Sequence, residues 1–159
     1  MVEPYHASAV GEVNVVTKMK ECSAVIGGEG NGGIIYPGLH YGRDALVGIA
    51  LFLSHLAVFG KNSSFLKATY PRYTISKNKI QLTPEINIES LLAKLQTKYQ
   101  NYPLNTIDGL KIEFDKDWIH LRKSNTEPII RIYSESNSEV VAANLAKKIQ
   151  MDINEILKS

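Results

Sequence analysis

Residues 111–136 read KIEFDKDWIHLRKSNTEPIIRIYSES. Three runs within them are rich in β-branched and aromatic residues, at 111–114, 118–122 and 129–135. A short polar turn separates the first run from the second, and a longer polar loop separates the second from the third. This pattern predicts a hairpin followed by a further strand.

The sequence on either side of this stretch predicts one more strand and two helices. Residues 72–82 alternate as a strand, and Ser136 with Glu139 has the spacing of a capping box at the start of a helix. Apolar stripes mark both helices: Ile88, Leu91, Leu92, Leu95 and Tyr99 in the first, and Val141, Leu145, Ile149, Ile153 and Ile156 in the second. We therefore expect residues 67–159 to form a small α+β domain, with a mainly antiparallel sheet and two helices on one face.

The first 66 residues have a different pattern, which predicts a partial α/β layer. Val13, Val16 and Met19 recur every three positions, which predicts a one-sided helix between residues 11 and 20. Residues 23–26 are expected to form a buried strand that leads into a glycine-rich loop, and residues 34–36 a short extended segment.

A second helix is expected to follow this loop. Asp44 is its predicted N-cap and Gly60 its predicted stop, while the apolar stretch 45–57 is too short to span a membrane and is interpreted as a core helix. The segments 61–64 and 70–71 mark a change of composition, with a short helical turn expected at 64–69. We place the domain boundary here.

Composition limits the functional classes. Of the 159 residues 44% are hydrophobic and the formal net charge is +2, which argues against disorder and against a strongly basic face for nucleic acid or membranes. The single cysteine, Cys22, excludes an internal disulfide and a cysteine-based zinc cluster, and we interpret it as an ordinary buried or half-buried residue. The N-terminus lacks signal-peptide features, so a cytoplasmic location is expected.

Residues 28–33, GEGNGG, satisfy the pattern G-x-G-x-x-G of dinucleotide-binding loops. An extended, proline-broken segment follows them where such a loop needs a helix, so we discount nucleotide binding. Glu29 and Asn31 are instead suited to bind the hydroxyl groups of a hexose, because a carboxylate accepts hydrogen bonds and an amide both donates and accepts them. A flexible turn with solvated polar side chains explains these residues equally well.

Residues 122–128, RKSNTEP, join two predicted strands and form the second candidate site. The Arg122 guanidinium can hold two phosphate oxygens, Ser124 and Thr126 offer hydroxyls, and backbone N–H groups of the turn can bind an anion. A Walker-type loop is excluded, since no helix follows. The alternative is an exposed polar loop, and we assign Lys123 to it. For Arg122, Ser124, Asn125 and Thr126 we favour anion binding once the family resemblance described next is counted.

Together the two loops resemble those of the α-D-phosphohexomutases, which include phosphoglucomutase, phosphomannomutase and phosphoglucosamine mutase. The family's sugar loop, G-E-x-S/N-G, is similar to residues 28–32, and its phosphate loop, R-x-S-G/N-T-E/x-P, to residues 122–128. The resemblance also includes the 42–44 segment, the Asp108–Gly109 turn and the terminal helix. It implies two groups of substrate-binding residues: Gly28, Glu29, Asn31 and Gly32 for the sugar, and Arg122, Ser124, Asn125 and Thr126 for the phosphate.

The resemblance also implies what this chain lacks. The family's serine loop, T-x-S-H-N-P, and its magnesium loop, D-G-D-x-D-R, do not occur in the sequence. We therefore expect a fragment that comprises the end of the third domain and the fourth domain, with no catalytic residue and no metal ligand, and inactive alone. The remaining N-terminal domains and magnesium are then expected in the full-length enzyme.

The expected ligand is a hexose phosphate, of glucose, mannose or glucosamine. We expect no binding to nucleic acid or to a membrane. Several bacterial members end the sugar loop in S-G-H where this chain has Asn31-Gly32-Gly33, and the pattern as a whole favours phosphoglucosamine mutase. One alternative is a stand-alone, non-catalytic sugar-phosphate-binding module. A nucleic-acid-binding α+β domain has little support from the nearly neutral charge.

Overall fold

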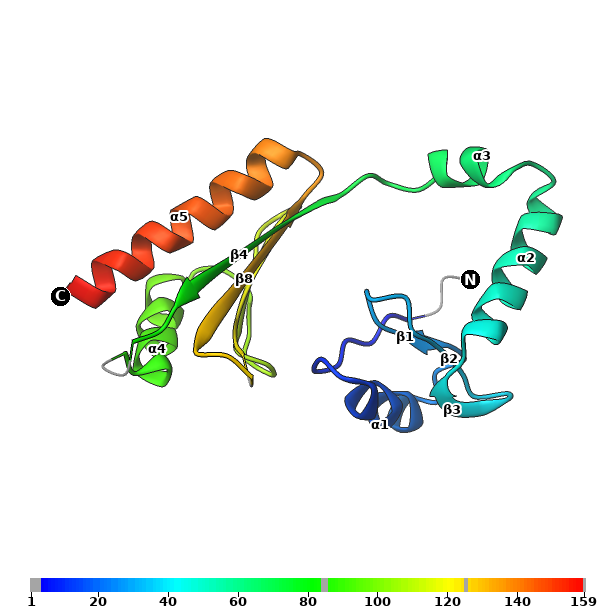
Figure 1. The fold of residues 1–159 in the computed structure, drawn as a ribbon, viewed down its shortest axis with the longest axis horizontal. Helices are drawn as coiled ribbons and strands as arrows, with labels where there is room; N and C mark the ends of the chain where they lie inside the picture. The colour runs from blue at the N-terminus through cyan, green and yellow to red at the C-terminus, as the bar shows by residue number, and fades with distance from the viewer. Residues whose placement is uncertain (1–3, 84–85, 125, 159) are drawn as a thin grey trace. The chain divides into compact units, whose positions relative to one another are not determined.

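A computed structural model describes residues 4–83, 86–124 and 126–158. The chain divides into two compact units, Met1–Tyr70 (unit 1) and Pro71–Ser159 (unit 2) (Figure 1). The domain limits expected from the sequence, 1–66 and 67–159, stay a prediction.

Unit 1 is built on a small antiparallel sheet of three strands in the order β1-β2-β3. Its elements are α1 (Glu12–Cys22), β1 (Gly27–Gly28), β2 (Ile34–Tyr36), β3 (His40–Arg43), α2 (Ala45–Phe59) and α3 (Ser63–Ala68). A small cluster of Val15, Met19 and Ile35 joins α1 to the central strand. The sheet edge at β1 fits closely under α1, because a Cβ on Gly27 would lie 2.2 Å from the Met19 sulfur.

The ends of α2 form as the sequence predicts. The Asp44 carboxylate accepts from the Val47 N–H at 3.0 Å, and Gly60 ends the helix in the left-handed conformation, with φ at +71°. The Asp44 side chain also accepts from the His40 ring at 3.2 Å. These hydrogen bonds, the one from Val47 first, lower the pKa of the Asp44 carboxyl below its usual value.

Three expectations for unit 1 are wrong. Val13 is 78% exposed, and Val15 is buried together with the predicted Met19, because these two residues lie four positions apart on the side of α1 that meets Ile35. Residues 23–26 form no strand: Ser23 ends α1 with φ at +55°, and only Gly27 and Gly28 pair with β2. The helix α2 is not a core helix among the described residues, since none of its own residues is buried.

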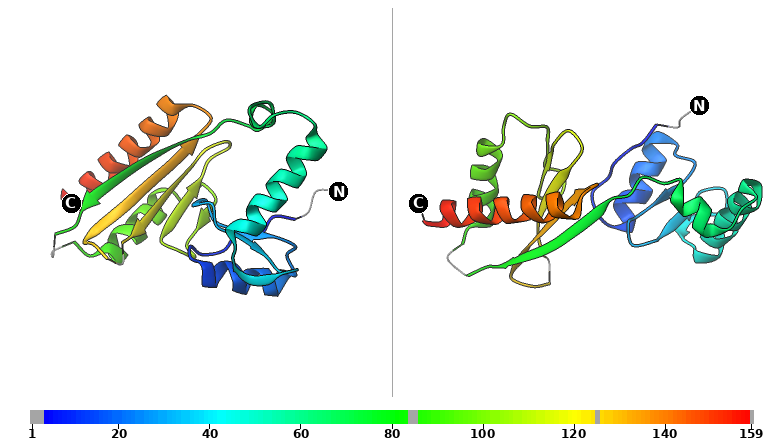
Figure 2. Two further views of the ribbon diagram at one scale, coloured as in Figure 1. Left: turned by 45° about the vertical axis from the view of Figure 1, so that its right-hand side comes forward. Right: turned by 90° about the horizontal axis from the view of Figure 1, so that it is seen from above.

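Unit 2 has the antiparallel sheet and paired helices that the sequence predicts. The strand order is β4-β8-β7-β6-β5, with every neighbouring pair antiparallel. Its elements are β4 (Thr74–Gln81), α4 (Ile88–Lys98), β5 (Leu104–Asn105), β6 (Leu110–Glu113), β7 (Trp118–Lys123), β8 (Ile129–Ser136) and α5 (Glu139–Lys158). Figure 2 draws α4 in light green and α5 in orange to red, beside the strands of this sheet.

The core of unit 2 lies on one face of this sheet. Alternate side chains of β6, β7 and β8 meet apolar residues of α4 and α5 in a single cluster. Its members are Leu91, Leu95, Tyr99, Leu110, Ile112, Ile119, Leu121, Ile130, Ile132, Ile149 and Ile153. The other face of β7 therefore carries the half-buried side chains of Trp118, His120 and Arg122, as strand alternation predicts.

Two details of α5 differ from expectation. The helix begins at Glu139 and the Ser138 hydroxyl accepts from the Val141 N–H, so the predicted capping box with Ser136 is wrong. Ser136 is buried instead, and its hydroxyl accepts from the Ser138 N–H at 3.1 Å. The buried stripe runs through Ala142, Ala146, Ile149, Asp152 and Ile153, whereas Val141 is exposed.

Candidate functional site

The second candidate loop, residues 122–128, connects the ends of β7 and β8 in unit 2. The Ser124 N–H donates to the Ile129 carbonyl at 3.0 Å, and the Ile129 N–H donates to the Glu127 carbonyl at 2.8 Å. The loop is therefore a strand connection in which the backbone is held at both sides. Asn125 lies outside the described residues, so its predicted role has no structural description.

Ser124 lies at the centre of the described part of the loop. Its side chain is buried, and its Oγ accepts from the Thr126 N–H at 3.4 Å and from Arg131 Nη2 at 3.5 Å. The Thr126 hydroxyl lies 3.4 Å from the same oxygen. Three of the predicted phosphate residues, Arg122, Ser124 and Thr126, thus belong to one short segment, with Ser124 in contact with both the loop and β8.

A second arginine joins this group. Arg122 on β7 and Arg131 on β8 are direct cross-strand partners, and so their side chains share the helix-free face of the sheet. Like charges in such a pair repel, and each guanidinium has its own carboxylate: Arg122 Nη1 lies 3.2 Å from Asp108 Oδ2, and Arg131 Nη2 lies 3.7 Å from Glu127 Oε2. The arrangement concentrates hydrogen-bond donors beside Ser124.

The register between β7 and β8 is what brings these arginines together. Arg131 received no role in the sequence analysis, because nine positions separate it from Arg122 along the chain. Strand alternation predicts the face of Arg122, but only the pairing of β7 with β8 shows that Arg131 lies opposite it. Chemically, two planar guanidinium groups and a hydroxyl suit a tetrahedral oxyanion.

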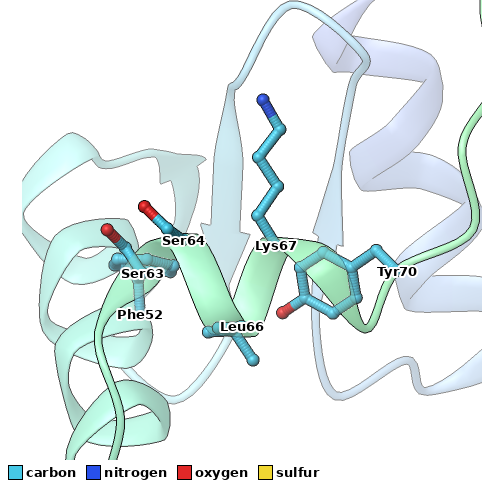
Figure 3. Close-up of a pocket in the computed structure, with 6 residues that line it drawn as sticks. All are labelled: Phe52, Ser63, Ser64, Leu66, Lys67 and Tyr70. Atoms are coloured by element: carbon cyan, nitrogen blue, oxygen red, sulfur yellow. The ribbon is translucent and has the colours of Figure 1, made fainter.

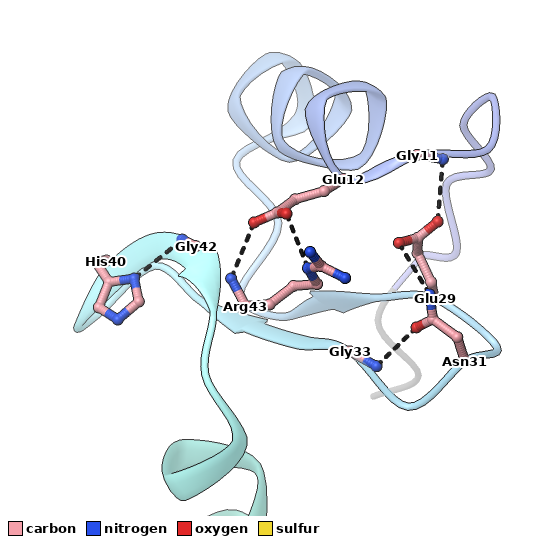
Figure 4. Close-up of polar contacts among 8 residues, drawn as sticks. All are labelled: Gly11, Glu12, Glu29, Asn31, Gly33, His40, Gly42 and Arg43. Atoms are coloured by element: carbon pink, nitrogen blue, oxygen red, sulfur yellow. Dashed lines mark hydrogen bonds and ion pairs between the residues drawn. The ribbon is translucent and has the colours of Figure 1, made fainter.

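The glycine loop of unit 1 is a tight turn between β1 and β2 (Figure 4). The Glu29 N–H donates to the Gly33 carbonyl at 3.1 Å, and the Gly32 N–H donates to the Glu29 carbonyl at 3.0 Å. Gly32 has φ at +92°, which favours glycine. Gly28 lies so close to the Gly33 carbonyl that a Cβ would be 2.5 Å from its oxygen. The strand after the loop agrees with our rejection of a dinucleotide site.

The two polar side chains of this loop contact each other and the backbone. Glu29 Oε1 accepts from the Gly11 N–H at 3.0 Å, and Glu29 Oε2 accepts from Asn31 Nδ2 at 3.4 Å. Asn31 Oδ1 accepts from the Gly33 N–H at 2.9 Å. The carboxylate and amide are therefore held together by the fold, with Asn31 exposed and Glu29 half-buried.

A neighbouring ion pair supports the same part of unit 1. The Glu12 carboxylate accepts from the Arg43 N–H at 3.1 Å and from Arg43 Nε at 2.8 Å, so it joins the first turn of α1 to the end of β3 (Figure 4). His40 Nδ1 accepts from the Gly42 N–H at 3.0 Å. These contacts hold β3, which pairs with the strand β2 that follows the glycine loop, and sequence spacing gave no signal for them.

Unit 1 also has a hollow of about 310 Å³, lined by Phe52, Ser63, Ser64, Leu66, Lys67 and Tyr70 (Figure 3). None of the predicted site residues that the structure describes lines it. Within the described ranges, no helix is long and apolar enough to cross a membrane. The same residues contain no group of three or more His, Cys, Asp or Glu that could hold a metal ion.

Two family models match the chain along most of its length. The model of the phosphoglucomutase/phosphomannomutase alpha/beta/alpha domain III matches residues 3–73, and that of the C-terminal domain of the same family matches residues 79–150. The fold and the two loops agree with these matches. The chain belongs to the phosphoglucomutase/phosphomannomutase family, as the resemblance of its loops implies.

Individual relatives agree with this assignment. The chain is 38% identical over 143 residues to a phosphoglucosamine/phosphogalactosamine mutase of Sulfurisphaera tokodaii, covering 89% of this chain and 31% of the relative. It is 40% identical over 131 residues to a phosphoglucomutase/phosphomannomutase of Thermococcus kodakarensis, covering 82% of this chain and 28% of the relative.

A solved structure has the same fold. A phosphoglucomutase/phosphomannomutase family protein from Burkholderia thailandensis superposes with a TM-score of 0.69 and 29% sequence identity, covering 94% of this chain and 31% of that one. The chain thus spans about a third of the length of these relatives.

Proposed function

We propose that this chain supplies the sugar-binding and phosphate-binding loops of a phosphohexomutase, which moves a phosphoryl group between the 1- and 6-positions of a hexose. The observation that carries the proposal is the cross-strand pair Arg122 and Arg131, together with the buried Ser124 hydroxyl, which lies 3.5 Å from Arg131 Nη2. The mutases among the relatives support the reaction class. A glucosamine phosphate is the preferred substrate in this proposal, since phosphoglucosamine mutases are frequent among those relatives.

In the proposed mechanism, the phosphate loop holds the phosphate that is not being transferred. Arg122 and Arg131 provide charged N–H donors, Ser124 and Thr126 provide hydroxyls, and Asn125 belongs to the same set by its position in the loop. Such contacts act by placing the sugar, because a correctly oriented substrate lowers the entropic cost of the transfer step. They supply no nucleophile.

The glycine loop has the complementary role. Glu29 accepts hydrogen bonds from sugar hydroxyls, Asn31 donates and accepts beside it, and Gly28 and Gly32 give the backbone its tight path. A sugar must bind in two orientations for both of its positions to react, so these residues are expected to recognise hydroxyls common to both. The phosphoryl-carrying serine, magnesium and the other domains are then supplied by the complete enzyme, which we place in the cytoplasm.

The test is the substitution Arg122→Lys, which keeps the charge but loses the planar fork. Binding of glucosamine 6-phosphate to the chain, followed by NMR chemical shifts, should weaken by roughly ten- to hundredfold, since a hydrogen bond to a charged group contributes about 1.5–3 kcal/mol. The melting temperature should change little, because a partly exposed ion pair contributes about 0–1 kcal/mol.

Lys123→Ala is the matched control for this experiment. Lys123 is exposed at the end of the same strand and has no assigned role, so its loss should affect binding only weakly. If Arg122→Lys and the wild type bind the phosphosugar equally, Arg122 does not belong to a phosphate site. Turnover of glucosamine 6-phosphate by this chain alone would contradict the proposal that the reacting groups lie elsewhere.

A further inference from the structure

The turn formed by Asp108 and Gly109 contacts the helix-free face of β7 at two points. His120 Nε2 donates a hydrogen bond to the Asp108 backbone carbonyl, and Arg122 Nη1 donates to Asp108 Oδ2 at 3.2 Å. His120 and Arg122 are alternate residues of one strand, so their side chains share a face. The backbone and the carboxylate of Asp108 are thus held by neighbouring side chains.

Gly109 fixes this turn against the strand. Its φ is +79°, a conformation that favours glycine, and a Cβ at this position would lie 2.2 Å from the Leu121 carbonyl oxygen. The same Cβ would be 3.2 Å from the Arg122 Cα. The turn therefore lies directly on the β7 backbone at the residue that carries the guanidinium, and this contact places the Asp108 carboxylate.

The Asp108 carboxylate is an unexpected neighbour for Arg122, which we propose binds phosphate. Its charge alone repels a phosphate, so an electrostatic argument predicts weaker binding because of Asp108. Arginine, however, has five N–H donors in a rigid fork on a flexible stem, and one bond to Asp108 does not exhaust them. A carboxylate that holds Nη1 restricts the stem and leaves further donors for a ligand.

We propose that Asp108 is a positioning residue: it orients the Arg122 guanidinium toward the phosphate while its own charge opposes the anion. The inference rests on the proposed function, because it assumes that Arg122 binds phosphate. Ordering a flexible side chain costs about 0.5–1.5 kcal/mol, and so loss of this restraint should weaken phosphate binding about two- to tenfold. Loss of Asp108 should therefore weaken phosphate binding, whereas removal of its negative charge alone would strengthen it.

The experiment is a titration of the 159-residue chain with inorganic phosphate, followed by NMR chemical shifts, for the wild type and Asp108→Ala, Asp108→Asn and Arg122→Lys. Asp108→Ala should bind phosphate about two- to tenfold more weakly. Asp108→Asn keeps an oxygen acceptor for Arg122 and should restore much of the affinity. The Nε–H signal of Arg122 should broaden or shift in Asp108→Ala and not in Asp108→Asn.

Glu113→Ala provides the matched control, because it removes an equal charge from the neighbouring strand β6. Glu113 is paired with Lys111 at 2.7 Å, and its loss should leave phosphate binding unchanged or slightly stronger.

The outcomes separate the two proposals. If the wild type does not bind phosphate, or Arg122→Lys binds it equally well, the proposed function fails and the positioning role with it. If Arg122→Lys is impaired while Asp108→Ala binds as well as the wild type or better, only the positioning role is refuted. An equal loss in Asp108→Ala and Asp108→Asn, together with a fall in melting temperature, would show that Asp108 serves the fold and would also refute it.

Discussion

Asp152 should be the polar residue on which unit 2 depends most. It lies in α5, is 7% exposed, and accepts hydrogen bonds from Lys98 Nζ at 2.6 Å and from the Tyr99 hydroxyl at the end of α4. Burial alone would raise the pKa of the Asp152 carboxyl, but these two hydrogen bonds outweigh it and keep the pKa below its usual value. The ionised carboxylate therefore joins the two helices.

The magnitude for Asp152→Ala follows from what each partner loses. The Tyr99 side chain is buried, and a buried hydroxyl without a partner costs about 1–3 kcal/mol. The Lys98 side chain is 43% exposed, so water replaces the lost carboxylate and the cost is about 0–1 kcal/mol. We expect the free energy of unfolding of unit 2 to fall by about 2–3 kcal/mol.

Urea unfolding followed by tryptophan fluorescence measures this change in the right unit, because the single tryptophan, Trp118, lies in β7. Glu155→Ala is the matched control: its carboxylate lies 3.3 Å from the same Lys98 nitrogen but is 69% exposed. Its loss should cost less than about 0.5 kcal/mol. Equal effects of the two substitutions would refute the reasoning that burial makes Asp152 important.

Three further predictions concern pH, a turn and the sugar loop. Burial and a neighbouring carboxylate raise the pKa of Tyr99, so the stability that its protonated hydroxyl contributes is present below the ordinary tyrosine pKa of about 10 and is lost as pH rises. In urea titrations at several alkaline pH values, Tyr99→Phe should lose less stability with pH than the wild type. An equal dependence of stability on pH in the two proteins would contradict this prediction. Gly109→Ala should destabilise unit 2 by more than about 1 kcal/mol in urea unfolding, because the residue has a positive φ and the new Cβ would meet the Leu121 carbonyl. Gly30→Ala adds its Cβ in open space and should leave the stability of unit 1 nearly unchanged. Glu29→Ala should weaken glucosamine 6-phosphate binding but cost less than about 1 kcal/mol of stability in thermal unfolding, because only one backbone N–H loses its acceptor, at a partly solvated position. Unchanged binding would show that Glu29 does not bind the sugar.

Local signals in the sequence predicted most of unit 2. Strand alternation gave the correct face for Trp118 and Arg122, because an antiparallel sheet with helices on one side separates apolar from polar residues. The Asp44 cap and the Gly60 stop were also correct, since both depend on only a few adjacent residues.

What the sequence did not reveal depends on contacts between distant segments. The opposition of Arg122 and Arg131 follows from a strand register that no short motif encodes. Asp152 interrupts an apolar stripe and reads as a solvent-facing residue until Lys98 and Tyr99 are placed beside it. Val25, by contrast, was expected to be buried and is exposed, because hydrophobicity alone does not show whether a neighbouring segment covers a residue.

The exposed apolar side chains of α2 should promote association of this chain in solution. Leu46, Ile49, Phe52, Leu53 and Val58 are all largely exposed on this helix. Exposed apolar surface of this kind promotes association between molecules. Concentrated samples should therefore scatter light through contacts made by unit 1, while the tryptophan signal of unit 2 stays that of the folded state. Dilute samples or a mild non-ionic detergent should suppress this association, so that the titrations report ligand binding alone.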